Sequence, residues 1–267
     1  NGHVLIEGVP GVAKTLLARL TARLIDADFS RVQFTPDLMP SDVLGTTVFN
    51  MKTNGFDFHQ GPIFADIVLV DEINRAPAKT QAALFEVMEE RQVSIDGTTH
   101  RMGELYTILA TQNPVEQEGT YKLPEAQLDR FLMKITMDYP SLEEEVNILE
   151  RHHTNAALVK LEDVTPVLTR EELLSLRALM SRVFVDRTLL QYIALIVQQT
   201  RTSKAVYLGA SPRASVAMLQ SSKAYALLQG RDFVTPEDIK FVAPYVLQHR
   251  LILTAEAEME GYSPVKV

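Results

Sequence analysis

Hydrophobic positions in the first half of the chain follow two alternating patterns. Short apolar runs bounded by turn residues predict strands of a parallel sheet that is covered on both faces. These runs lie at residues 3–7, 31–34, 67–72, 106–111 and 131–135. Between them, segments 16–24 and 78–90 carry apolar residues at helical spacing. Strands that alternate with helices predict an α/β fold, here with a parallel five-stranded sheet.

Two more segments of this half predict β-hairpins. One joins 46–50 to 56–59, and the other joins 92–95 to 98–101. The first connection contains an Asn-Gly pair and the second an Asp-Gly pair. Such pairs between strand-like runs are the strongest short-range hairpin signal, because both residue types tolerate the positive φ of tight turns.

Beyond residue 140 the apolar spacing is helical throughout. Five segments carry it: 142–151, 171–183, 188–200, 212–229 and 236–249. A chain of 267 residues is long enough for one large domain or two unequal ones. We therefore predict an α/β domain over residues 1–139 and an all-α C-terminal lid domain over 140–267.

Residues 8–15, with the sequence GVPGVAKT, join the first predicted strand to the first predicted helix. A glycine-bearing loop at such a junction turns backbone N–H groups and a helix N-terminus toward phosphate, as in the P-loop NTPases. We predict that Lys14 meets the β- and γ-phosphates and that Thr15 binds Mg²⁺. Ala13 replaces the usual second glycine, so we expect its φ to be negative. The alternative is a plain strand–helix turn with a chance Lys-Thr pair. The predicted nucleotide-binding residues are Gly8, Val9, Pro10, Gly11, Val12, Ala13, Lys14, Thr15 and Leu16.

Two acidic residues, Asp71 and Glu72, end the most apolar of the predicted strands. A carboxylate at that edge of the sheet can order Mg²⁺, and the next one can polarise a water aimed at the γ-phosphate. The alternative is a solvated turn. Because the pair follows the Lys-Thr loop on the next fully buried strand, we predict a metal-binding role for Asp71 and a catalytic role for Glu72.

Three further polar residues are candidates for the same site. Asn113 follows the neighbouring strand, where it can hold the same water or simply form a turn before Pro114. Arg130 lies between a helix and the last strand, and its alternative is a surface ion pair with Asp129. Arg213 stands in the first turn of a helix, where a cation is unfavourable unless an anion neutralises it.

Five segments together resemble the AAA+ ATPases of the MoxR type. They are residues 8–15, 71–75, 111–114, 123–131 and 209–213. The resemblance covers nearly the whole chain in the right order, and an alanine before the lysine is usual in that group. The two predicted hairpins resemble the helix-2 insert and the pre-sensor-1 hairpin of a clade that includes magnesium-chelatase motor subunits and replicative helicases.

The resemblance implies an ATPase that uses ATP and Mg²⁺. It matches Gly8, Gly11, Lys14 and Thr15 to Walker A, Asp71 and Glu72 to Walker B, Asn113 to sensor 1 and Arg213 to sensor 2. Arg130 matches the arginine finger, which reaches the nucleotide of the next subunit and so implies a ring, usually a hexamer. The family also has a segment before the first strand that contacts adenine. The sequence starts on a strand without Met, so we expect the native chain to begin earlier.

The leading functional hypothesis is therefore ATP-driven, chaperone-like remodelling of a partner protein, with a von Willebrand A domain protein as the client class that the resemblance suggests. A nucleic-acid motor is the first alternative. The net charge of −8 and the sparse basic residues of both hairpins disfavour nucleic acid as a partner. The second alternative, a nucleotide-dependent scaffold with little hydrolysis, is disfavoured by Glu72, Asn113 and Arg130.

Composition excludes several other classes of site. The chain has no cysteine, which rules out disulfides, thiolate catalysis and cysteine zinc sites. No apolar run approaches the roughly 20 residues of a membrane helix. No signal peptide is evident. We expect a soluble, cytoplasmic protein that does not insert into a membrane.

Overall fold

The computed structural model describes residues 2–9, 11–113, 120–154 and 161–267. Contacts divide the chain into two compact units. The first comprises His3–Lys122 and Ile135–Leu173, and the second comprises Leu123–Lys134 and Leu174–Val267 together with Gly2. The predicted division at residue 139 follows a different criterion, the change of apolar spacing, and stays a prediction.

A five-stranded sheet forms the centre of the first unit, in the order β2-β5-β8-β1-β9. Its strands are β1 (Val4–Gly8), β2 (Phe29–Gln33), β5 (Ile67–Asp71), β8 (Thr107–Gln112) and β9 (Met133–Met137), of which the first two residues of β9 fall in the second unit. The pairs β2–β5, β5–β8 and β1–β8 are parallel. Every residue of β5 is buried, as a strand covered on both faces requires. The predicted parallel α/β sheet is confirmed, with strand ends displaced by at most two residues.

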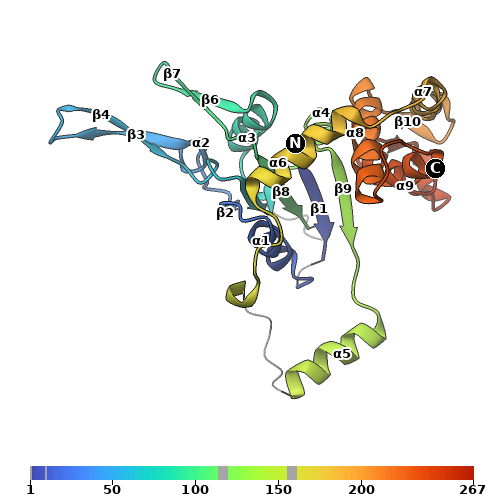
Figure 1. Ribbon diagram of the computed structural model, residues 1–267, viewed down its shortest axis with the longest axis horizontal. Helices are drawn as coiled ribbons and strands as arrows, with labels where there is room; N and C mark the ends of the chain where they lie inside the picture. The colour runs from blue at the N-terminus through green and yellow to red at the C-terminus, as the bar shows by residue number, and fades with distance from the viewer. Residues whose placement is uncertain (1, 10, 114–119, 155–160) are drawn as a thin grey trace. The chain divides into compact units, whose positions relative to one another are not determined.

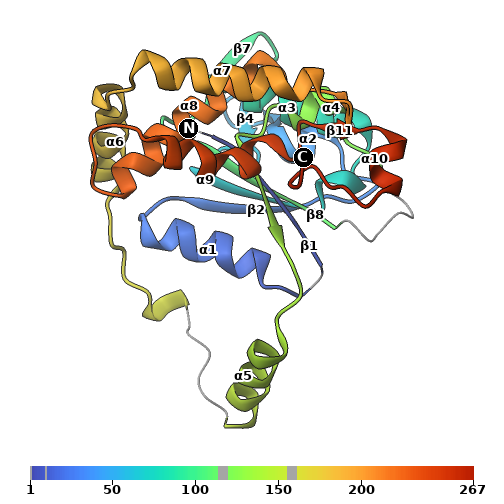
Figure 2. The ribbon, with the colours of Figure 1, turned by 90° about the vertical axis from the view of Figure 1, so that its right-hand side faces the viewer.

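Helices cover both faces of this sheet (Figure 2). On one face, α1 (Lys14–Leu24) turns Ala18 and Ala22 inward, and these small side chains allow close approach to the strands. On the other face, α3 (Ala78–Glu90) buries larger side chains, among them Leu84 and Phe85. The described part of this unit also contains four short or peripheral helical segments: α2 (Pro40–Leu44), η1 (Ile73–Arg75), α5 (Leu142–His153) and η2 (Leu161–Asp163).

Both predicted hairpins are present and extend from the sheet domain (Figure 1). They are β3 (Gly45–Asn50) with β4 (Gly55–Gln60), and β6 (Gln92–Ile95) with β7 (Thr98–Arg101). The turn of the second hairpin places Asp96 and Gly97 at φ 49° and 79°, as a type I′ turn requires. The first hairpin keeps an unbroken register from Gly45↔Gln60 to Asn50↔Gly55.

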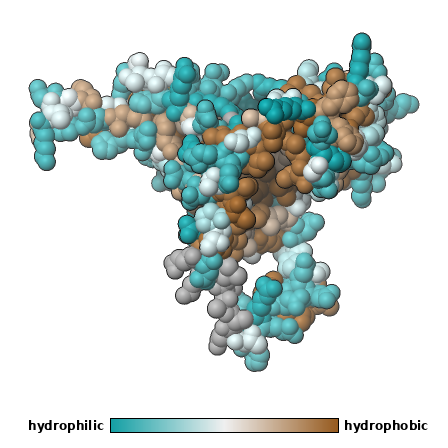
Figure 3. Space-filling view, viewed as in Figure 1, coloured by the Kyte–Doolittle hydropathy of each residue, from teal (hydrophilic) through white to brown (hydrophobic). Residues whose placement is uncertain are grey.

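The first hairpin exposes apolar side chains along its length (Figure 3). Met51 is 89% exposed at its tip, and Phe56 is 74% exposed. The ring of Phe56 meets that of Phe49 edge to face, with centroids 5.2 Å apart. At the base, Phe58 stacks on His100 of the second hairpin at 4.2 Å. The two hairpins therefore contact each other near their bases. The apolar tip of the first hairpin is exposed to solvent in the described chain.

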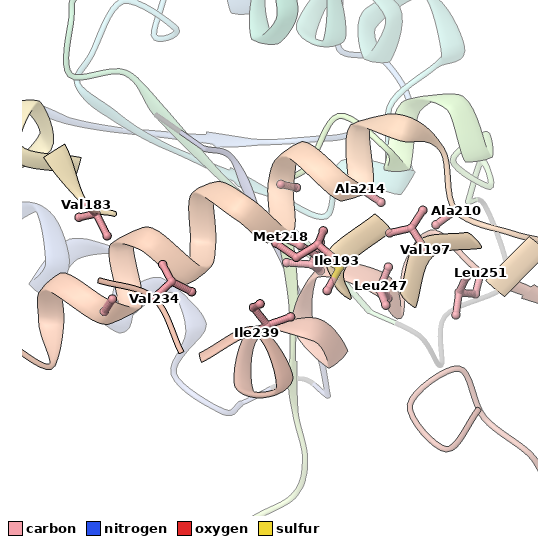
Figure 4. Packing of buried hydrophobic residues seen from close by; sticks show 13 residues of the cluster. Val183, Ile193, Val197, Ala210, Ala214, Met218, Val234, Ile239, Leu247 and Leu251 are labelled. Atoms are coloured by element: carbon pink, nitrogen blue, oxygen red, sulfur yellow. The ribbon is translucent and has the colours of Figure 1, made fainter. Parts of the chain in front are cut away.

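Helices dominate the second unit, around a core drawn from several elements (Figure 4). The main helices are α6 (Arg170–Leu179), which begins in the first unit, α7 (Arg187–Thr202), α8 (Pro212–Leu228) and α9 (Pro236–Leu247). Helix α8 buries Ala214, Ala217 and two serines, and such small side chains let neighbouring helices approach closely. Ile193, Met218 and Ile239 fill the space between the helices.

The apolar spacing missed several short elements of this unit. An antiparallel pair joins β10 (Val206–Leu208) to β11 (Ile252–Leu253). Helix α10 (Ala255–Met259) was missed as well, whereas α4 (Glu125–Leu128) is the helix expected before Arg130 and η3 (Met180–Arg182) continues the helix expected over 171–183. Segments of two to five residues are too short to establish a period. In the described residues, no helix is both long and apolar enough to cross a membrane.

A buried histidine ties β1, β8 and α3 together. His3 accepts a hydrogen bond from the N–H of Ile108 at Nδ1 (3.0 Å), so Nε2 carries the proton and donates to the carbonyl of Met88 (3.1 Å). Burial lowers the pKa of His3 from 6.5 to about 4. Since the unfolded chain then binds more protons than the folded one, this residue destabilises the fold progressively as the pH falls from about 6.5 to about 4.

We predict that His3→Gln makes stability less dependent on acid. Wild-type protein should lose up to about 1.4 kcal/mol per pH unit through His3 in this range, and the variant should lack that contribution. Urea unfolding at about pH 7 and about pH 5 measures the difference. His59→Gln, which removes an exposed histidine of β4, is the control. Equal slopes for His3→Gln and wild type would contradict the assignment.

Candidate functional site

The predicted phosphate loop connects β1 to α1 in the first unit. Gly8 ends β1, and a Cβ at this position would lie 2.7 Å from the carbonyl oxygen of Met137, so glycine is required by the close approach of β9. Lys14 begins α1, and its Nζ donates to the carbonyl of Gly8 at 2.7 Å. The lysine side chain thus folds back toward the end of β1. Pro10 lies outside the described residues.

The backbone of this loop corrects one expectation. We expected a negative φ at Ala13, but the residue has φ 56° and ψ 28°, in the left-handed region. Gly11 also has a positive φ, of 87°. The chain enters α1 through Ala13 as its N-cap, and a left-handed residue there costs an alanine about 1–2 kcal/mol. Glycine, the usual residue at this position, avoids that cost because it has no Cβ. Ala13 adopts the same backbone conformation with the conformational cost that a Cβ brings.

Asp71, at the end of β5, is held by donors from three other elements. Its Oδ1 accepts the hydroxyl of Thr111 on β8 at 3.0 Å. Its Oδ2 receives Arg31 Nε from β2 at 2.7 Å, and Thr15 Oγ1 from α1 lies 3.4 Å away. The carboxylate is buried while the arginine side chain is half exposed. The structure thus brings together the two predicted metal-binding residues, Thr15 and Asp71.

Arg31 was not identified from the sequence. Its strand, β2, lies beside β5, with Gln33 paired to Asp71 and Arg31 paired to Leu69. The available signal is that Arg31 lies two residues before Gln33, the residue of β2 that pairs with Asp71. This signal can be used only when the strand order is known, because a hairpin separates β2 from β5 in the sequence.

The oxygen atoms of Thr15 and Asp71 suit a Mg²⁺ ion better than a softer metal. Mg²⁺ is usually held by one or two protein oxygens together with water and substrate phosphates. In the described part of the chain, no cluster of three or more His, Cys, Asp or Glu residues is placed to hold a metal ion. The donor set therefore fits a cation that is bound jointly with a nucleotide, and does not fit a dedicated protein cage.

Glu72 follows β5 directly and has a left-handed backbone, with φ 56°. Its N–H donates to Thr111 Oγ1 at 3.0 Å, so one hydroxyl bonds to both acidic residues. Its carboxylate pairs with Arg75 Nε at 3.0 Å, and both side chains are about one third exposed. Asn113 is buried just after β8, the strand between β5 and β1. The carboxyl ends of these parallel strands meet at one edge of the sheet.

The other two candidates, Arg130 and Arg213, belong to the second unit. Arg130 lies in the turn between α4 and β9. Arg213 stands in the first turn of α8, and its N–H donates to the capping hydroxyl of Ser211 at 3.1 Å. Their roles at the nucleotide stay predictions.

Family models match both halves of the chain. Residues 3–133 match the model described as "ATPase family associated with various cellular activities (AAA)", and residues 198–267 match the AAA lid domain. The chain is 46% identical to "Chaperone MoxR1" of Mycobacterium tuberculosis over 99% of its length and 71% of that protein. It is 50% identical to protein YeaC of Bacillus subtilis, over 98% of this chain and 81% of that protein.

A more distant relative and a solved structure agree with these matches. "Protein MoxR" of Methylorubrum extorquens is 31% identical over 97% of this chain and 81% of that protein. The crystal structure of a "putative ATPase" from Cytophaga hutchinsonii is 44% identical and superposes with a TM-score of 0.88, over 98% of this chain and 81% of that one. From its two family matches and its relatives, the chain belongs to the MoxR family of AAA+ ATPases.

Proposed function

We propose that this protein binds ATP with Mg²⁺, hydrolyses it, and uses the turnover to remodel a partner protein. The observation that carries the proposal is the convergence of Lys14, Thr15, Asp71 and Glu72 at one edge of the sheet of the first unit. A cation, a hydroxyl and two carboxylates at the mouth of a helix are the groups that phosphoryl transfer to water needs.

Each of these residues has a role that follows from its position. Lys14 neutralises the β- and γ-phosphates, while Thr15 and Asp71 hold Mg²⁺, which when bound offsets the negative charge of the phosphates. Glu72 accepts a proton from the attacking water. Its pair with Arg75 is partly exposed to solvent, which weakens it, so the carboxylate can leave Arg75 and turn toward water at small cost.

The proposed assembly is a ring, a hexamer as in the family, that works in the cytoplasm. Arg130 of one subunit completes the site of the next, and Arg213 contacts the nucleotide of its own subunit. The name "Chaperone MoxR1" of a relative supports a client protein, for which we propose a von Willebrand A domain protein. The exposed Phe49, Met51 and Phe56 of the first hairpin also favour a protein client over nucleic acid, since hairpins that follow phosphates are basic.

The first test separates nucleotide binding from turnover. Lys14→Ala should lose ATP binding, whereas Glu72→Gln should bind ATP but hydrolyse it about 10²–10⁴-fold more slowly. Isothermal titration calorimetry and phosphate release measure the two properties. Lys79→Ala, at an exposed position of α3, is the control for loss of a lysine. Unchanged ATP affinity in Lys14→Ala would remove the phosphate-loop assignment, and normal turnover in Glu72→Gln would remove the base.

The hydroxyl shared by Asp71 and Glu72 gives a second prediction. Thr111→Val keeps the shape of the side chain but removes the donor to Asp71 and the acceptor for the Glu72 N–H. A lost hydrogen bond to a charged group is worth about 1.5–3 kcal/mol, so kcat should fall about 10- to 100-fold if the loss is expressed in the transition state. Thr111→Ser keeps the hydroxyl and should retain most of the activity. Equal rates for the two variants would show that the hydroxyl does not organise the site.

Composite sites between subunits give a third prediction. Arg130→Ala and Glu72→Gln proteins should each be nearly inactive, and mixtures should regain hydrolysis at interfaces that pair an intact Glu72 with an intact Arg130. Specific activity of wild-type protein should also rise with the mass found by light scattering. A finger acting between subunits is contradicted if both variants assemble and no mixing ratio restores activity.

A further inference from the structure

A buried arginine lies directly after α9 in the second unit. The side chain of Arg250 is only 3% exposed. A buried guanidinium is costly unless its donors are satisfied, because the charge has left water. The hydrogen-bond partners of Arg250 therefore indicate its structural role.

Nearly all acceptors of Arg250 come from the turn at residues 129–132. Its Nε donates to Asp129 Oδ1 at 2.7 Å. One terminal nitrogen donates to the carbonyls of Asp129 and Phe131, and the other to the carbonyls of Leu132 and Val246. A planar fork thus fixes three of the four backbone carbonyls of this turn. The fourth residue of the turn is Arg130.

The two residues before Arg250 bind the same segment. His249 Nε2 donates to the carbonyl of Phe131 at 3.1 Å, and burial keeps this ring neutral by lowering its pKa to about 3. Gln248 Nε2 donates to the carbonyl of Lys134 at 2.7 Å. Three consecutive side chains after α9 therefore hold the backbone on both sides of Arg130.

The other oxygen of Asp129 extends the network to α8. Asp129 Oδ2 accepts the hydroxyl of Ser211 at 2.7 Å, and Ser211 in turn caps the N–H of Arg213. Arg213 lies close enough to affect Arg250. Burial lowers the pKa of Arg250, its bond to Asp129 opposes that shift, and the charge of Arg213 lowers the pKa further. One carboxylate thus connects the turn that carries Arg130 to the start of the helix that carries Arg213.

We propose that Arg250, acting through Asp129, is a positioning residue that orients Arg130 toward the nucleotide of the neighbouring subunit. The inference rests on the proposed function. A buried ion pair adds little net stability compared with apolar side chains of the same volume, but a planar guanidinium that donates to one carboxylate oxygen and several carbonyls fixes geometry. Misplacement of a contact group by about 1 Å can cost on the order of 100-fold in rate, so the fork has a catalytic consequence without touching nucleotide.

The test uses Arg250→Lys, which keeps the charge and loses the fork. We expect kcat to fall about 10- to 100-fold with unchanged ATP affinity. Because the site of the variant's own subunit is intact, adding Glu72→Gln subunits should restore hydrolysis, as for Arg130→Ala. A residue needed only for folding would not be rescued by a partner that cannot itself hydrolyse ATP. Asp129→Asn should behave in the same way and serves as the second variant if Arg250→Lys does not fold.

Arg187→Lys, at an exposed position at the start of α7, is the matched control and should turn over like wild type. Thermal unfolding and light scattering establish that each variant is folded and assembled. Wild-type turnover in a folded Arg250→Lys or Asp129→Asn protein overturns the inference. So does a loss that Glu72→Gln subunits fail to restore while they do restore Arg130→Ala. If Arg130→Ala itself turns over normally, the finger in the proposed function fails and the inference fails with it.

Discussion

The arrangement of the first unit supplies hydrogen-bond donors to one buried carboxylate, that of Asp71. Asp71 ends a strand with no exposed residue, so its charge must be compensated by neighbours. The donors come from β2, α1 and β8, and each of them lies where the parallel order of the sheet puts it. A different strand order would leave Asp71 without these partners. The strand order of the sheet therefore determines which donors surround Asp71.

Much of the fold could be predicted because its elements carry strong local signals. The buried strands are continuous apolar runs, and Asp96-Gly97 supplies the positive φ values that a two-residue turn needs. The Lys-Thr and Asp-Glu pairs were found because their chemistry is confined to a few consecutive residues. The left-handed backbone of Ala13 was mispredicted, because the residue type favours a negative φ while the path by which the loop enters α1 requires a positive one.

The distant partners of Arg31 and Arg250 could not be predicted. Arg31 reaches Asp71 across 40 positions, and Arg250 reaches Asp129 across 121. A single sequence does not give the strand order or the packing that brings these pairs together, and without them either arginine resembles a surface residue. The short β10–β11 pair was missed for another reason, that two or three residues cannot display a period of two.

The first hairpin has a mechanical consequence. Its six cross-strand pairs run without a bulge, and at its base a Cβ on Gly61 would lie 2.3 Å from the carbonyl of Val43. The base is thus tightly packed while the tip, about 20 Å away for six residues of strand, is free of side-chain cover in the described chain. A rotation of a few degrees at Gly45 moves Met51 by an ångström or more, so a small movement at the sheet becomes a larger stroke at an apolar tip.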